Sequence, residues 1–115
     1  MKYLCLIYAD EAVATTMSKA ELGALYAEYG AFTESIKQSG QYLGGNPLQP
    51  VASATTVRVR DGKASATDGP FAETKEQLGG YYLIEARDLN DAIQVAARIP
   101  SARHGSIEVR PIQSM

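Results

Sequence analysis

The chain has 115 residues, 45% of them hydrophobic, which is enough for one domain with a core of its own. Eleven basic residues stand against 13 acidic ones, and the net charge is −2. We therefore expect a single domain over residues 1–115. Because the charges are balanced, we expect that this domain binds neither a nucleic acid nor an anionic membrane.

The first half of the chain predicts a strand, a helix and a short edge strand. Residues 2–9 are apolar on both faces, which is typical of a strand covered on both sides, and the run is too short to span a membrane. A helix is expected from Ser18, which forms a capping-box pattern with Glu21, to a stop at Gly40. Residues 41–50 predict a short edge strand and a bend.

Cys5 lies inside that first apolar run and is the one cysteine of the chain. A lone cysteine cannot form an internal disulfide, which fits a reducing compartment. We therefore expect a buried structural thiol and a cytoplasmic protein.

The second half predicts four more elements: a hairpin over residues 53–67, a strand over 81–86, a helix over 89–99 and a strand over 105–112. The hairpin turn is indicated by Asp61-Gly62 between two alternating segments. The helix is expected to begin after Asp88, a favourable N-cap, and to end before Pro100.

The predicted element order is strand, helix, strand, hairpin, strand, helix, strand. This order favours an α+β fold with a ferredoxin-like antiparallel sheet, two helices on one face and an extra β-hairpin. Two helices cover one face only, whereas strands 2–9 and 81–86 are apolar on both. We therefore expect a homodimer in which two sheets face each other.

Two segments carry a resemblance to a known family. The run DGPFAETKEQLGGYYLIEARDLNDAIQVAARIPSARHGSIEVRPI, residues 68–112, and the start MKYLCLIYADE resemble the DGPF-domain proteins of the YCII-related family. The resemblance implies a dimeric α/β barrel in a bacterial cytoplasmic protein, often encoded beside a sigma factor of the extracytoplasmic-function (ECF) type. Some YCII-related members look like enzymes that use a His–Asp pair, which the resemblance carries to His104 and Asp68.

The DGPF motif predicts a rigid turn. Asp68 is expected to accept hydrogen bonds from backbone amides of its own turn, Gly69 to take unusual dihedral angles, and Pro70 to fix the direction of Phe71. In one interpretation Asp68 caps the turn and Phe71 fills a gap at a dimer seam. In the other, Asp68 handles a proton and Phe71 walls a ligand pocket.

The segment after this motif offers further ligand contacts. Glu73 and Lys75 point the same way on an extended chain, either as a solvated ion pair or as pocket charges. Gly79-Gly80 permits a close approach of another backbone or of a ligand, or a bulge at the start of the strand. Tyr81 and Tyr82 face opposite sides of a strand, so one tyrosine leaves the helix side, and we choose Tyr82 as a ligand-positioning residue.

His104 stands at the entry to the last strand. A histidine there suits general acid–base work or a ligand contact, or it fixes the turn through a backbone carbonyl. Arg103 is a further positioning candidate. Arg110 shares the face away from the helices with Glu108 and either pairs with it or anchors an anion.

Three functions remain open on the sequence. One is a cofactor-free enzyme that performs proton transfer, elimination or hydrolysis with His104 and Asp68. Another is a non-catalytic module for a small-molecule ligand, and a third is a partner of an ECF-type sigma factor. Neither a metal-ligand spacing nor a phosphate loop nor a dinucleotide fingerprint occurs, so we expect no cofactor and no tightly bound metal.

Overall fold

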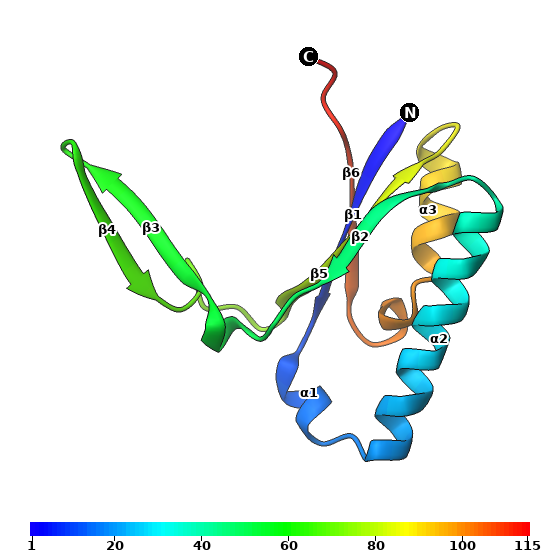
Figure 1. The fold of residues 1–115 in the computed structure, drawn as a ribbon, viewed down its shortest axis with the longest axis horizontal. Coiled ribbons are helices and arrows are strands. Elements are labelled where there is room, and N and C mark those ends of the chain that lie inside the picture. The colour runs from blue at the N-terminus through cyan, green and yellow to red at the C-terminus, as the bar shows by residue number, and fades with distance from the viewer.

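The computed structural model describes all 115 residues and contains a four-stranded antiparallel sheet with helices on one face (Figure 1). The sheet order is β2-β5-β1-β6, built from β1 (Lys2–Ala9), β2 (Tyr42–Pro47), β5 (Gln77–Glu85) and β6 (Ser106–Pro111). This mixed α+β architecture is compatible with the predicted ferredoxin-like arrangement. The dimeric barrel stays a prediction.

The core lies between the sheet and helices α2 (Lys19–Gln38) and α3 (Leu89–Ala97). Along β1, Tyr3, Cys5 and Ile7 are buried under these helices, as the period of two in a strand requires. The 12 buried residues of the core are Tyr3, Cys5, Ile7, Phe32, Ile36, Tyr82, Ile84, Ala86, Ala92, Val95, Ala96 and Ile99. Because residues of both helices share this cluster, the prediction that they cover the same face is confirmed.

Local signals fix the ends of both long helices. Ser18 and Glu21 form the expected reciprocal capping box at the start of α2, and Gly40 follows its end with φ +78°. The Asp88 side chain accepts from the backbone N–H of Asp91 at the start of α3. Pro100 then opens the 3₁₀ turn η2 (Pro100–Arg103).

The expectation of only two helices was wrong, because a short helix α1 (Glu11–Thr15) follows β1. It is capped by Asp10, and five residues are too few to show a helical hydrophobic period. A second 3₁₀ turn, η1 (Val51–Ser53), follows β2. Helix α1 lies beyond the end of β1 (Figure 1).

Strand β5 begins four residues before the predicted start. It pairs through Gly79-Gly80, where Ile7 faces Gly80 and Tyr8 faces Leu78, so Gly79 is the extra residue of a bulge. The bulge expected at the glycine pair is therefore confirmed.

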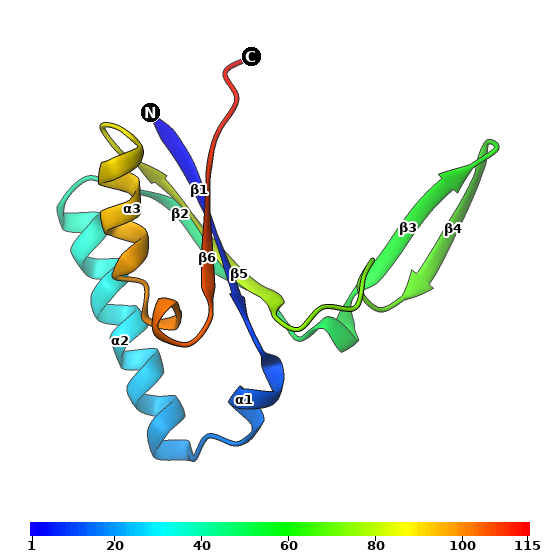
Figure 2. The same ribbon diagram turned by 180° about the vertical axis from the view of Figure 1, so that it is seen from behind.

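The predicted hairpin forms a separate two-stranded sheet of β3 (Thr55–Arg60) and β4 (Lys63–Asp68), here called the arm. The arm extends away from the body of the molecule (Figures 1 and 2). Asp61 and Gly62 both have positive φ, 52° and 75°, as the predicted tight turn requires. Val57 and Val59 are 66% and 60% exposed on one face of the arm.

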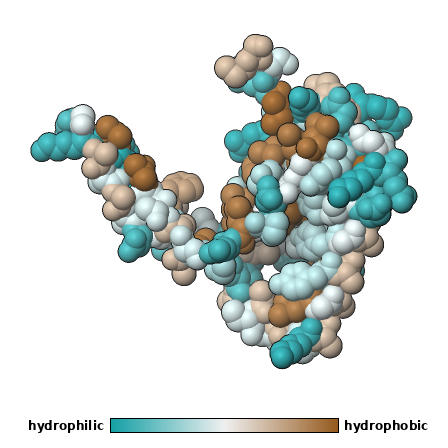
Figure 3. Space-filling view, in the orientation of Figure 1, coloured by the Kyte–Doolittle hydropathy of each residue, from teal (hydrophilic) through white to brown (hydrophobic).

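No helix covers the other face of the four-stranded sheet, here called the open face. Register places Leu4, Leu6 and Tyr8 of β1 on it, beside Tyr81 and Leu83 of β5. In Figure 3 hydrophobic atoms gather along the sheet on the side away from α2. None of the helices combines the length and hydropathy needed to cross a bilayer.

Candidate ligand-binding cleft

A cleft of about 490 Å³ lies between α2, α1 and the helix-facing side of the sheet. This volume is within the range of small-molecule sites. Its lining residues come from β1 and α1 (Ile7, Ala9, Asp10, Glu11, Ala14), α2 (Tyr26, Tyr29, Thr33), β2 and the segment after it (Tyr42, Gly45, Asn46, Pro47, Leu48), β5 (Gln77, Gly79, Gly80, Tyr81, Tyr82) and η2 (Ser101).

Glycines occupy two helix-facing positions of the sheet at the floor of the cleft. Gly45 pairs with Tyr82 and Gly80 pairs with Ile7, both of which face the helices. A Cβ at Gly45 would lie 2.8 Å from Cδ1 of Tyr82, and one at Gly80 would lie 3.0 Å from the Asn46 carbonyl oxygen. A side chain at either position would therefore crowd the tyrosine ring or the neighbouring strand.

Hydroxyl pairs form one wall. The Tyr82 hydroxyl lies 2.6 Å from Oγ1 of Thr33, and the Tyr29 hydroxyl lies 2.6 Å from Oγ of Ser101. The Tyr82 ring packs edge-on against Phe32, with ring centroids 5.2 Å apart. Burial raises the pKa of the Tyr82 phenol above its usual value, although the bond with Thr33 acts in the opposite direction.

The charged residues of the lining are Asp10 and Glu11. Glu11 Oε2 accepts from the backbone N–H of Val51 at 3.0 Å, and Asp10 Oδ1 accepts from the N–H of Ala12 at 2.9 Å. Neither carboxylate takes part in a salt bridge. The cleft is therefore acidic at the α1 end.

His104 and Arg103, both predicted site residues, lie outside the lining. Arg103 forms a bidentate ion pair with Glu28 of α2, with N–O distances of 2.6 and 3.0 Å. This pair holds the pKa of the Glu28 carboxyl below its usual value. The exposed His104 ring has no hydrogen-bond partner, and it is the backbone N–H of His104 that donates, to the Ser101 carbonyl at 3.2 Å.

The DGPF turn is built differently from the expectation. Asp68 ends β4 with an exposed side chain that accepts no hydrogen bond, so the predicted carboxylate cap is absent. The Gly69 N–H instead donates to the Ala54 carbonyl, and Thr56 Oγ1 donates to the Gly69 carbonyl. Gly69 takes the expected unusual dihedral, φ +100°. Phe71 is 79% exposed and lines no part of the cleft.

The remaining predicted residues also lie outside the cleft. Glu73 and Lys75 are exposed and form no ion pair with each other. Arg110 pairs with Glu108 on the open face, the simpler of its two interpretations.

Within one chain the arm that carries Asp68 stands well apart from η2, which precedes His104 (Figure 1). Of the predicted site residues, the cleft is lined by Tyr82. Sequence reasoning missed Tyr29, Thr33 and Tyr42. The available signal was the clustering of tyrosines on and just after the predicted long helix.

A family model described as the YCII-related domain matches residues 1–115. The chain is a member of the YCII-related family. It is similar to an uncharacterised protein, R00369, of Rhizobium meliloti (strain 1021), with 38% identity over 114 residues that cover 97% of this chain and 92% of that protein. The resemblance stated from the sequence is therefore confirmed.

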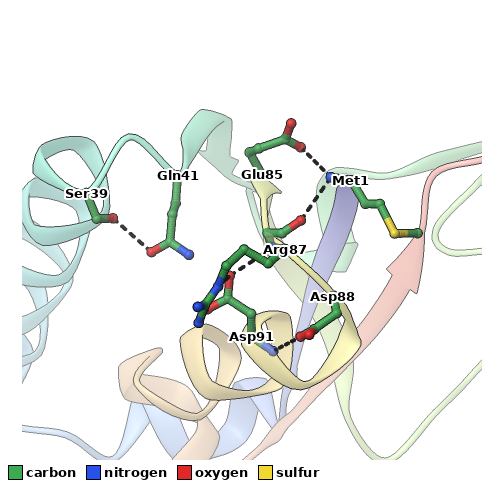
Figure 4. Close-up of polar contacts among 8 residues, drawn as sticks. Met1, Ser39, Gln41, Glu85, Arg87, Asp88 and Asp91 are labelled. Carbon is green, nitrogen blue, oxygen red and sulfur yellow. Dashed lines mark hydrogen bonds and ion pairs between the residues drawn. The ribbon is translucent and has the colours of Figure 1, made fainter.

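This YCII-related chain has a second hollow, of about 440 Å³, at the opposite end of β1. Figure 4 shows its polar residues bonded to one another: the amino group of Met1 contacts the Ala86 carbonyl at 2.9 Å and the Glu85 carboxylate at 3.2 Å. Arg87 pairs with Asp91 at 3.5 Å. With these charges already paired, the hollow is a weaker candidate site than the cleft.

Proposed function

We propose that this YCII-related protein is a homodimer that binds a small organic molecule in the cleft. The observation that carries the proposal is the cleft itself, a hollow of about 490 Å³ lined by tyrosine rings and a few polar groups. Gly45 and Gly80 belong to its floor, where the Tyr82 ring and the backbone of β2 pack directly against them. A hollow of this size with apolar walls and few polar groups favours a small-molecule ligand.

The hydroxyl pairs supply the recognition chemistry. In each pair one hydroxyl donates to the other, so the second hydroxyl keeps its own proton for an outside acceptor. The Tyr82–Thr33 and Tyr29–Ser101 pairs can therefore each offer a donor to a ligand. Tyrosine rings supply apolar contact surface around these donors.

The uncovered open face is the feature that supports the homodimer. Leu4, Leu6 and Leu83 lie there without cover from any element of the chain. The charged side chains of this face are balanced, with Lys2 opposite Glu85 and Arg110 paired with Glu108. A face that is apolar and electrically balanced can meet a copy of itself without net repulsion, so we assign a second copy as its occupant.

A tryptophan at the cleft tests the binding. Ala14 is an exposed residue of α1 that lines the cleft, whereas Ala12 is exposed on the same helix and does not line it. We expect Ala14→Trp to abolish the shifts that small-molecule fragments cause in the amide NMR signals of Gly45 and Gly80. Ala12→Trp should leave those shifts intact, and equal responses of the two variants would contradict binding in the cleft.

Cofactor-free acid–base chemistry by His104 and Asp68 is the second candidate. Both side chains are exposed and have no hydrogen-bond partner in their own chain, so each is free to act on a ligand. Because they stand apart in one chain, joint action needs the Asp68 arm of the other protomer. Once a turnover is found, His104→Ala and Asp68→Asn should each reduce it by about 100-fold or more. Full activity in both variants would remove this candidate.

A cytoplasmic location and a link to an ECF-type sigma factor stay predictions. The buried free thiol of Cys5 supports the first, since it is compatible with a reducing compartment. Co-purification of tagged protein with an ECF-type sigma factor from its own host would support the second, and its absence at matched expression would count against it.

A further inference from the structure

We propose that the cleft selects small organic cations, such as protonated amines, over anions of the same size. This inference rests on the proposed binding function. It adds the charge class of the ligand, which follows from three features of the lining.

The first feature is charge. Asp10 and Glu11 are the charged residues among the 19 that line the cleft, and neither is neutralised by a lysine, arginine or histidine. Glu11 is half-buried, so its charge is only partly screened by water. An anion entering the cleft would meet this negative potential without a compensating partner.

The second feature is hydrogen-bonding capacity. Glu11 uses Oε2 for Val51 and Asp10 uses Oδ1 for Ala12, which leaves one oxygen of each carboxylate without a partner in the chain. An ammonium group has three donors and no acceptor. It can therefore satisfy these oxygens through charge-assisted hydrogen bonds.

The third feature is aromatic surface. Tyr26, Tyr29, Tyr42 and Tyr82 all contribute to the lining. Cations are attracted to the faces of such rings. The chain itself gives an example, because Nζ of Lys37 lies 5.1 Å from the centroid of the Tyr42 ring.

The basic groups near the cleft are already engaged. Lys37 lies over Tyr42, Arg103 is paired with Glu28, and Arg98 contacts Ser35 and the Phe32 ring. None of the three lines the cleft. A carboxylate or phosphate in the cleft would therefore find hydroxyl donors but no cation.

Three probes of nearly equal shape test the inference: benzylamine, which is cationic at pH 7, benzyl alcohol, which is neutral, and benzoate. Each is titrated into the full-length protein while the amide signals of Gly45, Gly79 and Gly80 are followed by NMR. We expect benzylamine to bind about fivefold more tightly than benzyl alcohol, and benzoate to bind most weakly.

Paired variants show whether the two carboxylates cause the preference. Asp10→Asn with Glu11→Gln removes both charges and keeps an N-cap and an acceptor for Val51. Glu34→Gln with Asp61→Asn makes the same change in net charge at exposed positions outside the cleft. The first pair should abolish the preference for benzylamine, and the second should preserve it.

The outcomes distinguish a failure of the cation preference from a failure of the proposed binding function. If benzyl alcohol shifts the three glycine signals as strongly as benzylamine does, or if benzoate binds best, the cation preference is wrong while the cleft remains a binding site. If none of the probes shifts these signals at millimolar concentration, both the binding function and the inference that rests on it are contradicted.

Discussion

At the scale of single residues, the burial of Cys5 predicts how the stability of the protein changes with pH. The thiol is fully buried under the helices, and burial raises its pKa from the ordinary 9.0 to about 11. The charged thiolate is thus disfavoured in the folded state. A buried thiol of this kind is inert as a nucleophile, in agreement with the structural role predicted from the sequence.

This pKa shift predicts an alkaline loss of stability. Because the folded pKa is raised, the stabilisation is fully present below pH 9 and is lost as pH rises from 9 to about 11. The full effect is on the order of 2–3 kcal/mol in the free energy of unfolding. Urea unfolding of the wild type and Cys5→Ala between pH 8 and 11 measures it. The two stabilities should converge as pH rises, and parallel curves would contradict the assignment.

Residue-level features with local causes could be predicted from the sequence. The capping box of Ser18 and Glu21, the Asp88 cap and the Asp61-Gly62 turn depend on neighbours a few positions away. The pairing of Tyr82 with Thr33 joins residues 49 positions apart, so no local pattern contains it. The cap expected of Asp68 was wrong, because the Gly69 N–H donates to the Ala54 carbonyl of the segment before β3 and not to the carboxylate.

At the scale of elements, β2 carries two adjacent glycines with different surroundings, of which Gly45 lines the cleft and Gly44 does not. A Cβ at Gly45 would lie 2.8 Å from the Tyr82 ring and 2.9 Å from the Tyr81 carbonyl oxygen, whereas one at Gly44 would meet nothing within 4 Å. Both glycines lie in β2 and neither has positive φ. The pair is therefore a matched test of the packing at the cleft floor.

We expect Gly45→Ala to reduce the free energy of unfolding by about 1–3 kcal/mol, because Tyr82 and the backbone of β5 must shift. It should also move the ring signals of Tyr82 in NMR spectra. Gly44→Ala should stay within about 0.5 kcal/mol of the wild type. Denaturant unfolding measures both, and similar losses in the two variants would show that the floor is not closely packed.

Strands and long helices were predictable because their hydrophobic periods extend over many residues. Helix α1 was missed because it has only five residues and none of them is buried. The hairpin was predicted from its turn, but nothing in the alternation of β3 and β4 indicated that the arm would leave the body. That outcome depends on the connections through η1 and the DGPF turn, which have no periodic signal.

At the scale of the whole molecule, the open face raises the question of what covers it. A sheet with helices on one side and uncovered leucines on the other lacks the second layer that domains usually have. We propose that a second copy supplies that layer, as expected from the sequence.

A charge placed on the open face should separate the dimer. Leu6 lies at the middle of this face, whereas Leu89 on α3 is 50% exposed on the opposite side of the sheet. We expect Leu6→Lys to sediment as a monomer at micromolar concentration, because each copy would bring a further charge into the interface, and the cross-strand Glu108 is already paired with Arg110. Leu89→Lys should remain a dimer. Dimers of both variants would place the interface elsewhere, provided that circular dichroism shows both to be folded.

The most direct test of the whole account is a crystal structure of the protein soaked with benzylamine. We predict two chains apposed through their open faces, with the amine in each cleft between the α1 carboxylates and the tyrosine rings. A cleft that stays free of the amine while the compound binds elsewhere, or an open face left bare to solvent in every copy, would contradict it.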